Sequence, residues 1–280
     1  MPQASAATDG EQTSVQLPAM EDCRILGVYS MVRQTQIGQG TTSRGHDQKT
    51  YWFVRRSPEG EYFVQALNAN SIPSGPVAPV TRGEFLAAYQ PQSGYYEKRC
   101  LPFIESLKKK IAQADRLLAE GDLDAAEKEF IKALLLDEKH PKANIALGNI
   151  SLQKGDGKKL AAALRRIFDI DVLFTEQERH LFNEFAISLR KEQKFAEAVA
   201  FYEKALARND TDENLHFNIA RAKAEAGDPA GAMGHLERAL ALRPDFAHAQ
   251  RFLSGLRAGE PDRDDALPLP DITASIDHIP

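Results

Sequence analysis

The segment KFAEAVAFYEKAL, residues 194–206, places alanines between aromatic residues at fixed helical spacings. Ala198, Tyr202 and Ala205 are four and three residues apart, so they lie on one face of an α-helix. An ordinary amphipathic helix fills such a face with Leu or Ile. Alanine at these positions predicts that a second backbone lies close against the helix. A second copy of the pattern elsewhere in the chain would supply that backbone.

The same spacing of a small, a large and a small residue occurs in three segments, and the last two are 34 residues apart. The three sets are Ala126, Phe130 and Ala133; Ala198, Tyr202 and Ala205; Ala232, Leu236 and Ala239. A further segment places Leu147 and Gly148 where Phe185 and Ala186 stand later. Gly-Asp pairs follow at 121–122, 155–156 and 227–228, and Gln193 replaces the glycine once. Glycine accepts the left-handed conformation that ends a helix, and Asp caps the next helix.

These residues resemble the tetratricopeptide repeat family, whose helix–turn–helix units of about 34 residues stack on one another because no single hairpin can bury its own apolar face. The resemblance covers residues 107–258 and implies a mainly α, right-handed superhelical solenoid. The expected units are 107–140, 141–174, 179–212 and 213–246, with an insertion, TEQE, at 175–178 and a capping helix at 247–258. Leu160 and Ile167 stand where alanine is expected, which predicts altered packing between the second and third units.

Residues 23–92 differ in kind and predict a small β-rich or α+β module in front of the repeats. KTYWFVRR and EYFVQAL are dense in aromatic and β-branched residues and flank SPEG, a pattern that predicts a β-hairpin. RILGVYSMV predicts a further strand, NANSIPSGPVAP a rigid loop and TRGEFLAAY a short capped helix. A linker and leading helix at 93–106 would join this module to the repeats.

Charge separates the two ends from the rest of the chain. The formal net charge is −5, yet residues 1–22 hold four acidic residues and no Lys or Arg, and residues 259–280 hold six acidic residues and one arginine. The middle of the chain is therefore mildly basic. Segments of this composition cannot bury enough apolar area to order themselves, so we expect disordered acidic tails at both ends.

The sequence predicts a cytoplasmic protein without a metal site. Cys23 and Cys100 have no metal-ligand spacing, and a reduced setting is the simpler interpretation. No apolar run approaches the 18 or so residues that span a bilayer, and the first residues lack the basic start and apolar stretch of a signal peptide.

No catalytic constellation is visible, so we expect no enzyme and no cofactor. The segment GQGTTSRGH, residues 38–46, lacks the lysine of a phosphate-binding loop and favours a turn between strands. Arg55-Arg56 followed by NANSIPSG is similar to a cyclic-dinucleotide-binding motif, but the spacing does not match. The basic runs at 108–110 and 158–166 lack interleaved aromatics, so we expect solvated helix faces and no nucleic-acid partner. The histidines are scattered over different helices.

The resemblance implies a protein-interaction adaptor or scaffold that holds a partner peptide or helix in a concave groove lined by the first helix of each unit. The groove positions carried over are Asn149, Asn183, Ile187, Asn214, Phe217, Asn218 and Arg221, with Arg190 and Arg251 at the edges. Side-chain amides can bond a peptide backbone and arginines favour carboxylates, so an acidic partner suits this set. The two-lysine clamp of chaperone-binding members is absent, since Ile111 and Asp115 occupy its positions in the first unit.

Three points stay open at this stage. An alternative function is a regulatory protein whose N-terminal module senses a small ligand and whose repeats relay that state to a partner. Self-association is also compatible with the sequence. The tail at 259–280 joins acidic residues to spaced apolar ones, which gives the hypothesis that it competes with a partner for the groove.

Overall fold

The protein is described here by a computed structural model that covers residues 18, 20–37, 44–174, 179–208 and 210–259. The chain forms two compact units. The N-terminal unit runs to Leu67 and resumes at Val77–Leu101, and the helical unit comprises Asn68–Pro76 and the residues from Pro102 onward. Both predicted tails, the insertion at 175–178 and the loop at 38–43 lie outside the described residues.

The N-terminal unit is built on a twisted antiparallel sheet with the strand order β4-β3-β2-β1-β5. The strands are β1 (Arg24–Ile37), β2 (Arg44–Arg56), β3 (Tyr62–Leu67), β4 (Pro73–Val80) and β5 (Gln90–Pro91). The predicted hairpin is confirmed, since β2 pairs with β3 so that Trp52 faces Ala66. The loop expected at 68–79 is in part a strand. Its prolines are tolerated there because β4 is an edge strand, where a missing N–H breaks no ladder.

The short helix α1 (Arg82–Ala88) covers an aromatic core on the sheet. It begins as predicted with a capping box, in which Thr81 accepts from the Glu84 backbone and the Glu84 carboxylate accepts from the Thr81 backbone. Phe85 is buried and stacks on Tyr62 at 4.4 Å between ring centroids. The π-helical turn η2 (Tyr96–Cys100) then leads out of this unit.

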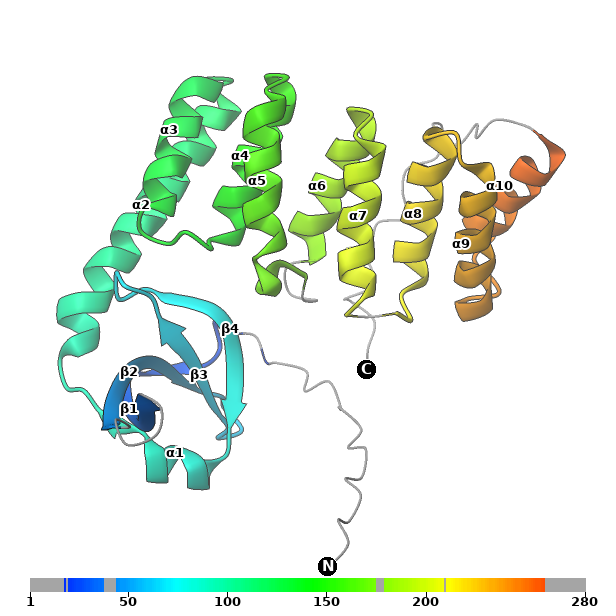
Figure 1. Ribbon diagram of the computed structural model, residues 1–280. Helices are drawn as coiled ribbons and strands as arrows, with labels where there is room; N and C mark the ends of the chain where they lie inside the picture. The colour runs from blue at the N-terminus through cyan, green and yellow to red at the C-terminus, as the bar shows by residue number, and fades with distance from the viewer. Residues whose placement is uncertain (1–17, 19, 38–43, 175–178, 209, 260–280) are drawn as a thin grey trace, which may run out of the picture. The chain divides into compact units, whose positions relative to one another are not determined.

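The helical unit is a row of antiparallel helix pairs followed by one further helix (Figure 1). The helices are α2 (Leu101–Ala119), α3 (Leu123–Leu134), α4 (Pro141–Gln153), α5 (Gly157–Phe168), α6 (Arg179–Lys191), α7 (Phe195–Leu206), α8 (Glu213–Glu225), α9 (Pro229–Leu242) and α10 (Ala247–Ala258). A 3-10 turn, η3 (Asp171–Phe174), follows α5. Among the described residues, no helix has the length and apolar character that crossing a membrane requires.

The turns within the pairs have the predicted chemistry. Gly121, Gly155 and Gly227 have φ values of +80°, +66° and +84°, and Gln193 takes the same left-handed conformation at +58°. The aspartates that follow each glycine accept a hydrogen bond from the first turn of the next helix. The third pair lacks this cap, because Lys194 stands at the equivalent position.

The alanine stripes are buried at the contacts between helices, as predicted. Ala126, Ala198 and Ala232 have no exposed surface. The exception predicted in the second pair is also present, since a large residue of α5 is buried where the other pairs have alanine. A smaller residue on α4 compensates for its size. Ile167 is fully buried, and the space it needs comes from Gly148, where an added Cβ would lie 3.5 Å from Ile167 and 2.7 Å from the ring of Phe185.

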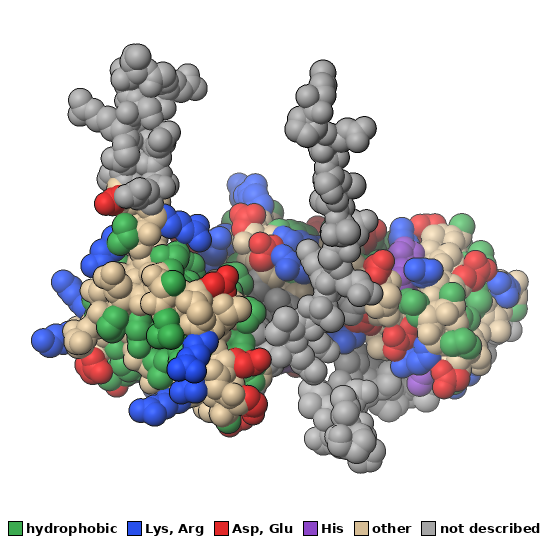
Figure 2. All heavy atoms as spheres, turned by 90° about the horizontal axis from the view of Figure 1, so that it is seen from below, with side chains coloured by type: hydrophobic (Ala, Val, Ile, Leu, Met, Phe, Trp, Pro, Cys, Tyr) green, Lys and Arg blue, Asp and Glu red, His purple; other side chains and the backbone are tan. Residues whose placement is uncertain are grey.

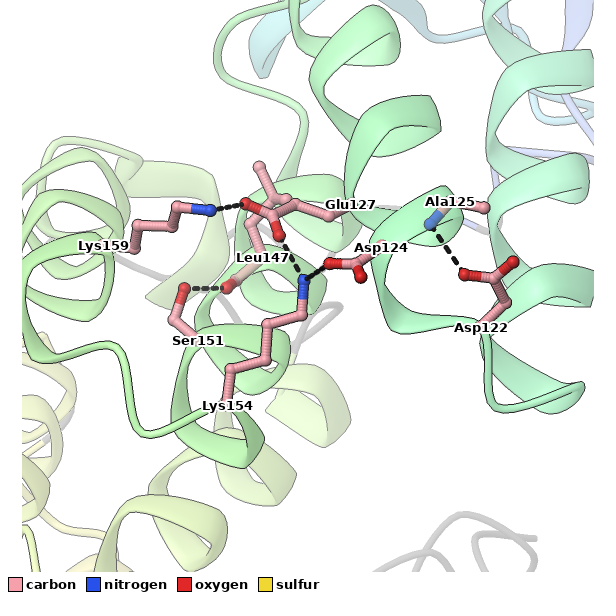
Figure 3. A network of polar contacts seen from close by, with 8 residues as sticks. All are labelled: Asp122, Asp124, Ala125, Glu127, Leu147, Ser151, Lys154 and Lys159. Carbon is pink, nitrogen blue, oxygen red and sulfur yellow. Dashed lines mark hydrogen bonds and ion pairs between the residues drawn. The ribbon is translucent and has the colours of Figure 1, made fainter.

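An ion-pair network ties the first pair of helices to the second (Figure 3). The carboxylate of Glu127 on α3 forms ion pairs with the ammonium groups of Lys154 and Lys159, each at 2.5 Å. The carboxylate of Asp124 forms one with Lys154 at 2.6 Å. The hydrogen bonds from Lys154 and Lys159 hold the pKa of Glu127 below its usual range. Lys159, from the basic run at 158–166, thus takes part in a contact within the chain.

Residues 68–76 pack on the end of α3 within the helical unit. The amides of Asn68 and Asn70 each donate to the carbonyl of Leu136 at 3.0 and 2.9 Å, so they satisfy an acceptor that a helix end leaves free. Ile72 is 3 % exposed and lies in the core formed by α2, α3 and α4. A segment expected in the N-terminal module therefore acts as a cap for the first pair of helices.

Candidate partner-binding surface

The first helices of the second, third and fourth pairs lie in sequence along the helical unit. α4 contacts α6. Arg190 of α6 forms an ion pair with Glu225 of α8, and Arg179 forms one with Asp212, which also caps α8. These contacts place α6 and α8 side by side at both ends. Side chains that project from the same faces of α6 and α8 therefore form a common surface.

The predicted groove residues divide into three groups by burial. Asn183, Phe217, Asn218 and Arg221 are 5–8 % exposed. Asn149, Ile187, Arg190 and Asn214 are half-buried, and Arg251 is exposed. The side-chain amide of Asn214 is engaged within the chain, because it accepts from Arg243 at 3.5 Å and donates to Glu213 at 3.3 Å.

Phe217 lies in the core and is not available to a partner. Its ring packs against Phe246 at 5.0 Å and Phe252 at 6.2 Å, so it helps to hold α10 on the fourth pair. Arg251 lies on α10 with Gln250, Ser254 and Gly255, on the wall of a separate hollow. The structure therefore brings together the predicted residues of α6 and α8 but not these two.

Three of the predicted residues hold buried polar atoms that have no hydrogen-bond partner among the described residues. They are Asn149 Oδ1, Asn183 Oδ1 and Arg221 Nε. Asn149 and Arg221 stand at the same position of their units, eight residues after the start of α4 and of α8. Buried polar groups are normally satisfied, so these atoms are exceptions within the part of the chain that the structure describes.

Within the described residues, Arg221 on this surface has no counterion. Burial raises the pKa of the Tyr202 phenol, and the charges of Arg190 and Arg221 act against that rise, so both guanidinium groups lie near the phenol. Glu225 is paired with Arg190. Among the described residues, no carboxylate lies within ion-pair distance of Arg221. A cation that is 8 % exposed and unpaired favours the approach of an anion.

Sequence reasoning did not assign Tyr202 and Glu225 to this surface. Tyr202 was interpreted as packing alone, which its 1 % exposure supports. Glu225 stands four residues after Arg221 on α8, and such a pair shares one helix face. This spacing could have assigned Glu225 to the same surface as Arg221. The partner it takes, Arg190, lies 35 residues away and is visible only in the folded chain.

Other sites for chemistry were sought among the described residues. No group of three or more His, Cys, Asp or Glu side chains could hold a metal ion there. Cys23 and Cys100 are both buried. The histidines are less scattered than the sequence indicates, since His216 and His235 meet at 3.1 Å between their Nδ1 atoms. Over the helices at the right of Figure 2, basic and acidic side chains are interspersed on the visible face.

Comparisons with known proteins place the repeats in a family. Family models described as tetratricopeptide repeat match residues 111–170 and 189–266. No curated protein sequence matches the chain.

Solved structures similar in fold include MamA from Desulfovibrio magneticus, with 13 % identity, 55 % of this chain and 85 % of that one covered, and a TM-score of 0.41. PilF of Pseudomonas aeruginosa has 18 % identity, coverages of 56 % and 70 %, and a TM-score of 0.41. YrrB, described as a repeat protein of this family with an unusual peptide-binding site, has 21 % identity, coverages of 59 % and 87 %, and a TM-score of 0.39.

Proposed function

The helical unit of this chain belongs to the tetratricopeptide repeat family, and on this basis we propose that the protein is a cytoplasmic, non-enzymatic adaptor that holds an acidic partner peptide against α4, α6 and α8. Stacked helical repeats present extended surfaces suited to chains rather than to small molecules. The partner class follows from the surface that these three helices share.

The unpaired Arg221 is the observation that carries this proposal. The side-chain amides of Asn149 and Asn183 are of the kind that bonds an extended peptide backbone, and among the described residues neither Oδ1 atom has a donor. An acidic side chain of the same peptide would meet the Arg221 guanidinium in a charge-assisted hydrogen bond. Arg190, already paired with Glu225, supplies positive potential nearby. Acceptors and an unpaired cation on one surface match the alternating chemistry of an acidic peptide.

The proposal is tested by comparing what three forms of the protein capture from an extract of the native cell. The forms are the wild type, Arg221→Gln and Arg165→Gln. Arg165 is an exposed arginine of α5 and serves as a matched control for loss of charge. We expect one or more proteins to be captured by the wild type and by Arg165→Gln and to be lost with Arg221→Gln. A circular dichroism melt of each variant verifies that it is folded.

The candidate contact is then verified with the captured protein itself. Its acidic segments, prepared as synthetic peptides, are titrated into the wild type and Asn183→Leu, which removes a buried acceptor. Weaker binding to Asn183→Leu would locate the peptide on α6. Capture that is equal for all three forms, or peptides that bind the wild type and Asn183→Leu alike, would contradict the proposed surface.

A further inference from the structure

Two histidines face each other where α8 and α9 pack together. His216 lies in the first turn of α8 and is 7 % exposed, and His235 lies near the middle of α9 and is half-buried. Their Nδ1 atoms are 3.1 Å apart, and their ring centroids are 5.3 Å apart. The first distance is that of a hydrogen bond in which one Nδ1 donates and the other accepts. This histidine contact therefore joins the two helices of the fourth pair through side chains that titrate.

The hydrogen bond between the two rings tolerates one added proton but not two. With both rings neutral, or with one of them charged, one Nδ1 can carry a proton while the other offers a lone pair. With both rings charged, each Nδ1 carries a proton and no acceptor remains. Two positive charges then meet across the 3.1 Å that the hydrogen bond had spanned. Separation or repulsion of the rings follows, and either one weakens the packing of α8 on α9.

The surroundings of His216 favour the neutral ring. Burial lowers the pKa of His216, and the charge of Arg238 on α9 acts in the same direction. Asp210 and Asp212 raise it from the turn before α8, and the ring also bonds to the backbone of Asp210. Asp212 is already engaged, because it caps α8 and forms an ion pair with Arg179. The first turn of a helix disfavours a cation as well.

The surroundings of His235 act in the same way. Burial lowers the pKa of His235, and the charges of His216 and Lys223, both on α8, add to this effect. Asp228, in the turn before α9, raises it, but Asp228 lies 3.5 Å from Lys223, which offsets its charge. A proton on one ring therefore makes the proton on the other harder to add.

We propose that the histidine contact is a pH-sensitive joint between α8 and α9, which holds while at least one ring is neutral and is lost when both are protonated. Its loss would loosen the fourth pair of helices and leave the first two pairs packed, because both rings belong to the fourth pair. α8 also carries Arg221, so partner binding at that surface would weaken in acid. This last consequence rests on the proposed function, whereas the joint itself does not.

The pH range of the effect follows from the two states of the chain. A histidine of the unfolded chain has a pKa near 6.5, and burial lowers the pKa of both rings in the folded protein. As the pH falls, the unfolded chain therefore binds protons before the folded protein does. The stability that the contact contributes is complete above about pH 6.5 and declines below it.

The coupling between the rings is tested by NMR titration of the full-length wild type, His216→Gln and His235→Gln. Glutamine does not titrate and can keep a hydrogen bond to the remaining ring. Each variant also assigns one of the two ring signals by its disappearance. In the wild type we expect the pair to titrate in two steps at least about one pH unit apart. In each variant the remaining ring should titrate in a single step.

Hydrogen exchange, corrected for the intrinsic effect of pH on the exchange rate, locates the consequence. Between about pH 7.5 and pH 5, amides of α8 and α9 in the wild type should lose about tenfold more protection than amides of α3 and α5. His235→Gln should not show this excess loss. His180→Gln is the matched control, since His180 is exposed on α6, and it should behave as the wild type does.

Two results would overturn the proposal. The first is independent titration of both rings in the wild type, each in one step with the midpoint that it has in the variant. The wild-type curves decide this point even where a variant is less stable. The second is equal loss of protection in α8 and α9 of the wild type and of His235→Gln, which would assign the pH dependence to other groups. Neither measurement uses a partner, so failure of the proposed function would leave both results unchanged.

Discussion

At the scale of single residues, the contacts between helices are set by side chains that are as small as the position allows. Gly148 is the clearest case, because an added Cβ would lie 2.7 Å from two ring atoms of Phe185. We expect Gly148→Ala to destabilise the protein by about 1–3 kcal/mol through overpacking. In denaturant melts, Gly234→Ala on α9 is the matched control, since nothing lies within 4 Å of a Cβ added at Gly234. It should gain up to about 1 kcal/mol from helix propensity.

The alanine stripe gives a second test at this scale. Ala198 and Ala232 have no exposed surface, and Ala196 on the same helix as Ala198 is exposed. Leucine at either buried position should cost about 1–3 kcal/mol, because the helices cannot separate without losing their other contacts. Leucine at Ala196 should change the free energy of unfolding by less than about 0.5 kcal/mol. Similar melts for all three variants would show that the packing face is assigned incorrectly.

At the scale of elements, the segment 68–76 stabilises the first pair of helices from outside the repeat. Ile72 is 3 % exposed in the core of α2, α3 and α4, so Ile72→Ala should cost about 2–5 kcal/mol. Ile131, which is 46 % exposed on α3, provides the control, and its replacement by alanine should have little effect. Hydrogen exchange should report faster exchange in α3 of Ile72→Ala. Unchanged protection there would mean that the segment does not support the helix.

His140 gives α4 a start that depends on pH. Its Nδ1 accepts from the backbone N–H of Ala143 at 3.3 Å, which requires the neutral ring. Burial lowers the pKa of His140 in the folded protein. The unfolded state, with a pKa near 6.5, therefore takes up the proton first as the pH falls. Stability from this group is complete above about pH 6.5 and declines as the pH falls from there toward the folded-state pKa.

Replacement of His140 by Asn isolates this contribution. Asparagine caps a helix without titrating, so His140→Asn should lose less stability than the wild type between about pH 7.5 and pH 5. His216 and His235, whose pKa values are also lowered chiefly by burial, should leave a remaining pH dependence in the variant. Denaturant midpoints measured across this range would decide the matter. Parallel pH profiles for both proteins would contradict the role of His140 as a cap.

At the scale of the whole molecule, the sequence predicts the features that depend on the spacing of residues close together in the chain. The sequence predicts the alanine stripes, the Gly-Asp turns and the capping helix, because each depends on residues only a few positions apart. Contacts that form only on folding escape this reasoning. Ile72 lies in the core of the repeats although it precedes them in the sequence. Phe217 is buried because α10 covers it. Arg221 was predicted as a groove residue, but its lack of a counterion depends on where every nearby carboxylate lies.

The N-terminal unit also contains features that the sequence did not predict. The strands β1, β2 and β3 and the capped helix were predictable from composition, whereas β4 and the division of residues 68–76 from this unit were not. The alternative function, in which this unit senses a small ligand, stays a prediction from the sequence. A thermal shift of the full chain with nucleotides and common metabolites would test it.

The charge distribution leads to a last prediction about the surface around Arg221. The residues after Ala258 include six acidic side chains and one arginine, and they are joined to α10, two helices beyond α8. A tether of about twenty residues can hold such a segment at millimolar effective concentration near a weak site. We therefore expect a chain truncated after Ala258 to bind a synthetic peptide of residues 259–280, and the full-length protein to bind it several-fold more weakly.

The position of that contact is tested by substitution in the truncated chain. Because Arg221 has no ion-pair partner among the described residues, Arg221→Gln should remove binding of the tail peptide, while Arg165→Gln should retain it. Titrations at low and at physiological salt would show the loss of affinity that screening of an ion pair requires. Equal affinity of the full-length and truncated proteins would exclude competition by the tail. The surface proposed for the partner would then be tested by the effect of Arg221→Gln on partner capture alone, because a site can bind a partner without binding the tail.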